Sequence, residues 1–431
     1  MVSRNPSRTS AIAVGLLGIG LLSPVAAAVA AAKITPLASR PASTSPGFTR
    51  VDPEGAGIRF TNSVPADRHL TNQIYLNGSG IALGDVTGDG LPDLLFAAPA
   101  GQTALFRNLG GWRFEELSGN LPAVARGLDG SGVLLADLDG DGDLDAVLNT
   151  VGQGTHVWWN QGQGTFAVGP VLNSGHAGTS LAAADADGDG DLDLYTANYR
   201  PTTLRDDPNG KFTIRPEATG HRVITYNGRP TSDPDLVGRF VVTPSGVKET
   251  GEPDALFLNE GQGRFRTVSW TEGVFLDEAG KPLVAPPYDW GLSVMFRDVT
   301  GDGRPDLYVC NDFESPDRFW INETVPGVPG GPVRFRAAPL RALRHTSAFS
   351  MGVEAADVNR DGIDDFLVLD MLSRRHADRS RQADNLPPSR HDPTLPEERN
   401  QFSQNTLFLG RGDGNFAEIA RFAGLAASEW S

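Results

Sequence analysis

Cysteine, lysine and long apolar runs are scarce in this chain, and each scarcity excludes a class of protein. The single cysteine, Cys310, excludes an internal disulfide framework and a zinc site built from cysteines. Only four of the 37 basic residues are lysines, and the 53 acids give a formal net charge of −16, so we expect no nucleic-acid partner. Beyond residue 32, no apolar run reaches the roughly 18 residues that a transmembrane helix needs.

Turn-forming residues are abundant instead. The 51 glycines and 31 prolines argue against long helices and coiled coils. Hydrophobic residues make up 39% of the chain and charged residues 21%, which is enough for a packed core. The composition therefore favours short strands joined by many tight turns.

The first 32 residues predict a secretory signal. Arg4 and Arg8 supply a positive start, an apolar segment follows over 11–22, and alanine-rich sequence up to Ala32 offers cleavage sites. A membrane anchor is the alternative, although glycines and Pro24 interrupt the run. We expect export to the periplasm, the cell surface or the medium, and loss of the two arginines changes the net charge from −16 to −18. Residues 33–54 are expected to form a linker.

Five nine-residue segments share one frame, with oxygen-bearing side chains at positions 1, 3, 5 and 9 and glycine at position 6. We call them loops one to five, and they span 85–93, 137–145, 185–193, 298–306 and 357–365. The side chains at positions 1, 3, 5 and 9 are the candidate metal ligands: Asp85, Thr87, Asp89 and Asp93; Asp137, Asp139, Asp141 and Asp145; Asp185, Asp187, Asp189 and Asp193; Asp298, Thr300, Asp302 and Asp306; and Asp357, Asn359, Asp361 and Asp365.

Alternating carboxylates around a glycine turn, closed by a further acid, form the oxygen cage that Ca²⁺ prefers. An EF-hand closes with glutamate at position 12, whereas these loops close at position 9. We predict up to five structural Ca²⁺ ions, which lower the repulsion among the 20 acids of the loops. Loops one and four carry Thr87 and Thr300 at position 3 and should bind most weakly. Solvated acidic turns are the alternative.

Short apolar runs flank each loop, such as 80–84 and 94–97 around loop one, and predict buried strands. A second signature follows, as in 104–114, where an apolar run leads to Asn108 and a glycine-rich turn. The turn predicts a hairpin. Each repeat therefore predicts four antiparallel strands, which is one propeller blade.

These motifs resemble the FG-GAP/VCBS repeats of integrin α-subunit propellers, and more closely those of secreted bacterial proteins related to cartilage acidic protein and UnbV. The resemblance covers roughly residues 55–431 and implies an all-β, calcium-binding β-propeller. Such propellers usually have about seven blades, whereas five repeats are visible here and 423–431 resembles the lead-in to another. We expect a truncated product that lacks the C-terminal domain of the family, or a ring completed by a partner chain. In the alternative, Ile58–Phe60 closes the ring.

Two repeats carry insertions between their second and third strands, at 198–252 and 373–401. The connections before and after a strand lie at opposite ends of a blade, so we expect the insertions on the face opposite the Asp loops. Long loops on a rigid scaffold commonly carry function, although these insertions could also serve only to cover the ring. The candidate ligand-binding residues of this face are Arg200, Asp206, Asp207, Asn311, Asp312, Glu314 and Arg318.

Two functions follow from these residues. The first is an exported binding module for a protein or glycan, with calcium in a structural role. The second is a hydrolase or lyase acting on an extracellular polymer through acids of the insertion face, such as Asp206, Asp207, Asp312 and Glu314. Acids converging in a pocket beside an arginine or histidine would favour the enzyme, and dispersed acids would favour the binding module.

Overall fold

The computed structural model describes residues 48–64, 66, 68, 73–218, 220–243, 246–313, 315–325, 332–383 and 399–429. The predicted secretory signal therefore lies outside the described residues. The chain divides into Met1–Arg50 and Val51–Ser431, and the architecture below belongs to the second unit. It is all-β, as predicted from the sequence. Among the described residues, no helix is both long enough and apolar enough to cross a membrane.

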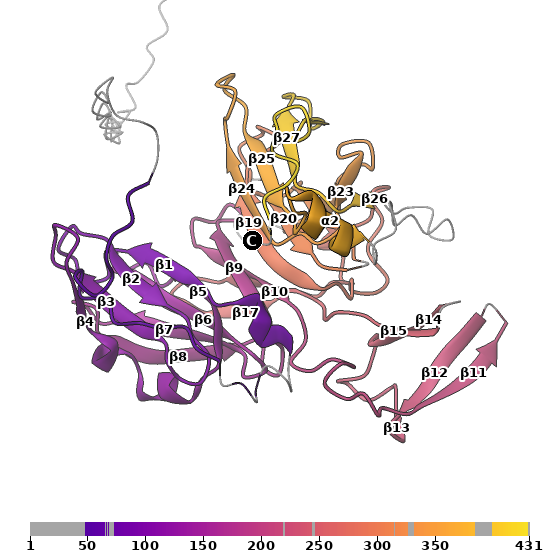
Figure 1. The fold of residues 1–431 in the computed structure, drawn as a ribbon, viewed down its shortest axis with the longest axis horizontal. Coiled ribbons are helices and arrows are strands. Elements are labelled where there is room, and N and C mark those ends of the chain that lie inside the picture. Colours follow the sequence, from indigo (N-terminus) through magenta and orange to yellow (C-terminus); the bar gives the residue numbers. More distant parts are fainter. Residues whose placement is uncertain are drawn as a thin grey trace, which may run out of the picture. The chain divides into compact units, whose positions relative to one another are not determined.

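Five antiparallel sheets follow one another along the chain, and we call them blades one to five (Figure 1). Blade one contains β1 (Ile81–Gly84), β2 (Asp93–Phe96), β3 (Ala104–Asn108) and β4 (Phe114–Glu116), and blade two contains β5 (Gly130–Ala136), β6 (Asp145–Thr150), β7 (Thr155–Asn160) and β8 (Phe166–Leu172). Blade three contains β9 (Gly178–Ala184), β10 (Asp193–Asn198), β16 (Ala255–Asn259) and β17 (Phe265–Thr267). Blade four contains β19 (Gly291–Arg297), β20 (Asp306–Asn311), β21 (Arg318–Asn322) and β22 (Phe335–Ala337), with β18 (Phe275–Leu276) parallel to β22. Blade five contains β24 (Gly352–Ala356), β25 (Asp365–Leu369), β27 (Thr406–Gly410) and β28 (Phe416–Glu418).

Each blade has the predicted up-and-down order, and the first strand of each blade packs beside the first strand of the next. The core lies between the faces of consecutive blades. In β6, Ala146 and Leu148 pack toward blade one, whereas the intervening Val147 packs toward blade three. Side chains of a strand alternate between its two faces, so a strand buried on both sides is apolar throughout. The sheets are therefore arranged as the blades of a β-propeller.

Aromatic side chains fill the later blade interfaces. Tyr195 and Trp320 lie in the cluster between blades three and four, and Tyr308, Phe366 and Phe408 lie between blades four and five. The lone cysteine, Cys310, is fully buried in the second of these clusters. Burial raises the pKa of its thiol and keeps it protonated.

Short elements complete the described chain. The connection between β10 and β16 forms a three-stranded sheet of β11 (Phe212–Glu217), β12 (Gly220–Tyr226) and β13 (Arg229–Pro230), and a hairpin of β14 (Phe240–Thr243) and β15 (Gly246–Glu249) (Figure 1). β23 (His345–Ser347) pairs with β26 (Asn400–Phe402), and α2 spans His376–Ala383. The 3-10 helices are η1 (Gln73–Asn77), η2 (Ser118–Asn120) and η3 (Ala123–Gly127).

The N-terminal segment lies against blade one rather than completing blade five. Ala56 accepts a hydrogen bond from the Phe114 backbone N–H of β4, at 2.7 Å, and Phe60 stacks on Phe96. Residues 58–60 form no strand, and blade five already has four strands of its own. The alternative in which Ile58–Phe60 closes the ring is therefore wrong.

Candidate metal centres

The first aspartate of each loop folds the loop around its own carboxylate. In loop one, Asp85 accepts hydrogen bonds from the backbone N–H groups of Gly88 at 2.8 Å and Gly90 at 2.6 Å. Asp137, Asp185 and Asp298 accept the corresponding bonds in their loops. Both glycines have positive φ, which favours glycine over residues with a Cβ. The repeated sequence therefore produces a repeated loop conformation.

The closing aspartate of each loop is the first residue of the second strand and is buried. Asp145 accepts a hydrogen bond from the Leu138 N–H at 2.9 Å and another from the Asn160 N–H at 2.8 Å. Burial raises the pKa of Asp145 and Asp306 to about 6 and that of Asp193 to about 7. A buried carboxylate of this kind gains stability from a cation that shares its site.

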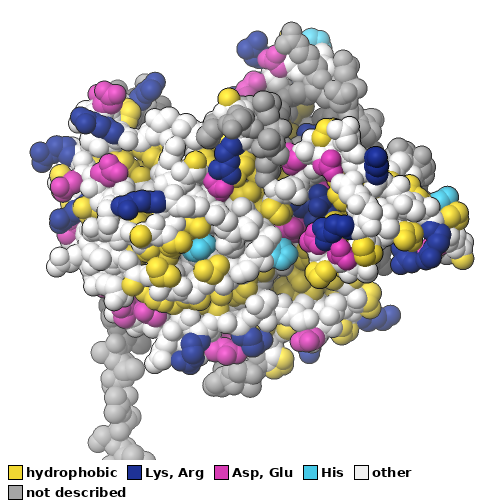
Figure 2. All heavy atoms as spheres, turned by 90° about the horizontal axis from the view of Figure 1, so that it is seen from below, with side chains coloured by type: hydrophobic (Ala, Val, Ile, Leu, Met, Phe, Trp, Pro, Cys, Tyr) yellow, Lys and Arg dark blue, Asp and Glu magenta, His cyan; other side chains and the backbone are white. Residues whose placement is uncertain are grey.

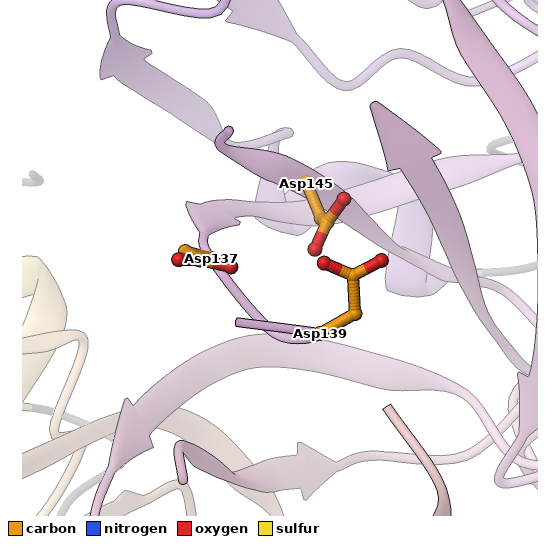
Figure 3. A group of neighbouring side chains, drawn as sticks. All are labelled: Asp137, Asp139 and Asp145. Carbon is orange, nitrogen blue, oxygen red and sulfur yellow. The ribbon is translucent and has the colours of Figure 1, made fainter. Parts of the chain in front are cut away.

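Loops two and three each bring three carboxylates together. Asp137, Asp139 and Asp145 have oxygens within 4.8 Å of one another, and Asp185, Asp187 and Asp193 repeat this arrangement. Figure 3 shows the carboxylates of Asp139 and Asp145 facing each other, with Asp137 beside them. Carboxylate oxygens alone suit a hard cation such as Ca²⁺. The residues present therefore fit a metal ion in both loops.

Repulsion within these two loops supports that fit. Burial and the neighbouring Asp189 raise the pKa of Asp187, and burial and Asp141 raise that of Asp139. Within the described part of the chain, no basic side chain forms an ion pair with an acid of either loop. A divalent cation would relieve this uncompensated negative charge.

The other three loops differ because each has a group that neutralises or binds an acid. Arg107 donates to Asp89 in loop one, and Arg304 pairs with Asp302 in loop four. In loop five, the side-chain amide of Asn359 donates to Asp361 at 2.8 Å. At position 3 of loops one and four, the hydroxyl oxygens of Thr87 and Thr300 are buried within the loop. These hydroxyl oxygens could bind a metal ion, but loops one and four carry less uncompensated negative charge than loops two and three.

Sequence reasoning missed the role of the asparagine that ends the third strand. Asn160, Asn259 and Asn322 each donate a backbone N–H to the closing aspartate of their own blade. Their side-chain Nδ2 atoms donate to the carbonyl at position 2 of the preceding loop, which belongs to Val86, Leu138 or Ala186, at 2.7–2.9 Å. The signal in the sequence is that an asparagine recurs at the end of the third strand in the hairpin signature, and this recurrence could have indicated a link between blades.

Three of the proposed ligand-face residues hold the fold together. Arg200 is buried and donates to the carbonyls of Thr250 and Gly251, where the insertion rejoins blade three. Arg318 donates two hydrogen bonds to Asp289, at 2.6 and 3.0 Å. The Asn311 side chain is fully buried and donates to the Pro316 carbonyl.

Two of the proposed acids of this face bind groups within the insertion of blade three. Asp206 accepts hydrogen bonds from the backbone and hydroxyl of Thr203, and Asp207 accepts from Tyr226 at 2.6 Å and from Asn227. Asp312 is buried, and Glu314 lies outside the described residues.

Asp312 lines a cavity of about 640 Å³. The starting ends of β1, β5, β9 and β19 form its wall together with the loop before β24, so it lies at the end of these strands opposite the Asp loops. Arg205, from the insertion of blade three, also lines it. Its guanidinium lies 5.7 Å from the centre of the Phe313 ring, and Phe313 has a φ of 56°. Strained residues of this kind tend to occur at functional sites.

Comparison with known families identifies the repeats. A family model described as FG-GAP-like repeat matches residues 85–148, 137–196 and 298–368. Residues 85–196 and 298–368 of this chain are therefore similar to FG-GAP-like repeats. The three matches include all five Asp loops and exclude the insertion of blade three. The predicted resemblance to FG-GAP repeats is confirmed for these segments.

Solved structures similar to this chain include BBS1N in complex with ARL6DN, from crystals soaked with mercury or lead, and the V. cholerae biofilm matrix protein Bap1. BBS1N is 12% identical, with a TM-score of 0.28, and the match covers 67% of this chain and 73% or 74% of that chain. Bap1 is 11% identical, with a TM-score of 0.28, and the match covers 68% of this chain and 66% of that chain. No curated protein matches the chain.

Proposed function

We propose that this protein is an exported calcium-binding β-propeller that acts as a binding module for a protein or glycan, with calcium in a structural role. The observation that carries the metal assignment is the pair of carboxylate triads in loops two and three, whose oxygens lie within 4.8 Å of one another. Loops one, four and five complete the set of up to five ions at lower affinity, because arginine or asparagine side chains already bind their acids.

Thermal unfolding of the full chain in millimolar Ca²⁺ and in excess chelator tests the metal assignment. A site held at 100 times its Kd stabilises the folded state by about 2.7 kcal/mol. We expect a cooperative transition whose Tm falls in chelator. Asp139→Ala and Asp187→Ala should each remove part of the response, whereas Asp413→Asn, in an exposed hairpin turn, should leave it intact. Equal Tm values with and without Ca²⁺ would contradict a structural role.

The ligand is proposed to bind at the cavity lined by Arg205 and Asp312. Its volume of about 640 Å³ lies within the usual range for small-molecule pockets, so it fits one or two sugar units or a peptide side chain. Arg205→Ala and Phe313→Leu should both abolish the hits of a glycan-array or peptide-array screen. Arg266→Ala changes an arginine paired with Glu260 outside the cavity and should retain them. Hits that survive both cavity variants would place the binding site elsewhere.

The proposed export of the protein and the class of its partner are inferred from the sequence. The predicted signal at 1–32 supports export to the periplasm, the cell surface or the medium. The net charge of −16 argues against nucleic acid. On the face drawn in Figure 2, basic and acidic side chains are interspersed rather than separated by sign. We expect mass spectrometry to detect the protein in the extracytoplasmic fraction, with a new N-terminus near residue 32.

The hydrolase or lyase alternative has less support. Glycoside hydrolysis usually needs two carboxyl groups about 5–10 Å apart across the bond that breaks. Among the described residues that line the cavity, Asp312 is the one acid. Release of reducing ends from a bound polysaccharide, lost in Asp312→Asn, would overturn the proposal in favour of an enzyme.

A further inference from the structure

Asn259 contacts the loops of both carboxylate triads, one through its side chain and one through its backbone. Its Nδ2 donates to the Leu138 carbonyl of loop two at 2.7 Å. Its backbone N–H donates to the Asp193 carboxylate of loop three at 2.8 Å. Asn259 is 1% exposed, so water does not compete for either bond. One residue therefore contacts both candidate metal loops, although its own position is 121 residues from Leu138.

Both contacts lie beside metal-ligand positions. Leu138 stands between Asp137 and Asp139 in the sequence, and its N–H donates to the Asp145 carboxylate of the triad at 2.9 Å. Asp193 is itself a member of the second triad. Any change in loop two that moves the Leu138 carbonyl also moves Asn259, and Asn259 holds the Asp193 carboxylate.

We propose that Asn259 couples the two metal sites, so that an ion in loop two raises the affinity of loop three and the reverse. This inference rests on the proposed metal binding and adds cooperativity between neighbouring blades. Ordering one loop fixes Asn259, and the second loop then loses less conformational freedom when it binds. Coupling between sites is reciprocal and usually amounts to a factor of five or more. Asn259 is a positioning residue, since it touches ligand-bearing loops rather than the ion.

Calorimetric titration of the full chain with CaCl₂ measures this coupling as a thermodynamic cycle. Of the two tighter sites, Asp187→Ala leaves loop two and Asp139→Ala leaves loop three, whereas the unsubstituted chain has both. The Asp139→Ala, Asp187→Ala chain gives the heat of the weaker loops, which is subtracted from each titration. The coupling factor is the ratio of the joint binding constant to the product of the single-site constants. We expect at least about fivefold coupling in the unsubstituted chain. In Asn259→Ala, the factor should fall to one.

Asn322→Ala is the matched control. Asn322 makes the same two bonds one blade further on, to Asp306 of loop four and Ala186 of loop three, and does not contact loop two. The Asn322→Ala variant should lower the stability of the chain as Asn259→Ala does, but it should keep the coupling between loops two and three. Asn259→Leu, which is close to asparagine in size and removes the amide donor without adding a charge, is the second variant if truncation prevents folding.

Three results separate the outcomes. A factor of one in the unsubstituted chain, with both loops binding Ca²⁺, overturns the coupling and leaves the metal assignment standing. A factor that survives in both Asn259 variants, or that disappears equally in Asn322→Ala, overturns the role of Asn259. A titration in which neither loop binds Ca²⁺ overturns the proposed function and the coupling with it.

Discussion

Arg107 donates two hydrogen bonds to the carboxylate of Asp89, from Nε at 3.1 Å and from Nη2 at 2.8 Å. Asp89 occupies position 5 of loop one, where a metal ligand is expected, and these bonds lower its pKa. A neighbouring guanidinium therefore supplies part of the positive charge that a cation would supply. Arg304 does the same for Asp302 in loop four. The five loops share one sequence frame but differ in how much negative charge is left for a metal.

Replacing Arg107 with glutamine should strengthen calcium binding in loop one. The ion pair is exposed to solvent and therefore weak, so we expect a modest decrease in the Kd of loop one. Calorimetric titration in an Asp139→Ala, Asp187→Ala background isolates the weaker loops. Arg266→Gln, which breaks an exposed pair outside the loops, is the control. An unchanged Kd in Arg107→Gln would show that Arg107 does not set the affinity of loop one.

The loops and blades could be predicted because their determinants are local. The frame from Asp137 to Asp145 fixes the turn through its own backbone, and the flanking apolar runs alternate between two blade interfaces. The pairing of Arg107 with Asp89 could not be predicted, because the two residues are 18 positions apart and meet only after β3 has packed. For the same reason, the sequence could not reveal that Asn259 reaches Leu138.

The candidate ligand-binding residues show a second limit of prediction from the sequence. Arg200 and Arg318 are polar residues in a loop region, which made them candidates for binding. In the structure, each satisfies buried groups instead, through the Thr250 carbonyl and the Asp289 carboxylate. Sequence position shows that a polar residue lies near an insertion, whereas burial and hydrogen bonds decide whether it can meet a ligand.

Buried carboxyls outside the metal loops should make stability depend on pH. Asp254 accepts hydrogen bonds from the Tyr195 hydroxyl at 2.9 Å and from the Asn198 N–H, and burial raises its pKa to about 7. Asp317 is held in the same way by Tyr308 and has a pKa of about 7. A raised carboxyl pKa stabilises the folded state fully below about pH 4, and this contribution is lost as the pH rises toward 7.

Urea unfolding in saturating Ca²⁺ between pH 4.5 and 7.5 tests this dependence. The free energy of unfolding should fall across this range, and Asp254→Asn should flatten the fall. Asp207→Asn is the control, because hydrogen bonds to Tyr226 and Asn227 lower the pKa of Asp207, so its contribution is lost at acid pH instead. A slope that is unchanged in Asp254→Asn would show that Asp254 does not titrate in this window.

Gly410 should resist replacement by the asparagine found at its position in the other blades. An added Cβ would lie 2.5 Å from the Asp364 carbonyl oxygen and 2.6 Å from Cγ2 of Ile363. We expect Gly410→Asn to destabilise the chain by about 1–3 kcal/mol. Gly352→Ala, where nothing lies within 4 Å of the new Cβ, should change stability by well under that amount. A stabilised Gly410→Asn protein would mean that blade five accepts the common residue after all.

Asn322 and Asn108 form a matched pair for measuring the link between blades. Each donates its backbone N–H to the closing aspartate of its own loop, and each accepts a bond from the backbone two residues later. Nδ2 of each residue donates to a proline carbonyl of its own loop, Pro305 for Asn322 and Pro92 for Asn108. Of the two, Asn322 also reaches a neighbouring blade, through Nδ2 to the Ala186 carbonyl at 2.9 Å.

Truncating Asn322 to alanine leaves a buried carbonyl of the neighbouring blade without its donor, which costs about 1–3 kcal/mol. Asn108→Ala should cost less, because its Pro92 bond is exposed and water can replace the amide. Urea unfolding monitored by tryptophan fluorescence gives both values under identical conditions. The difference between the two variants measures the bond between blades, since their local bonds are the same. Equal losses would show that the asparagine stabilises only its own hairpin and that its bond to the neighbouring blade adds nothing to stability.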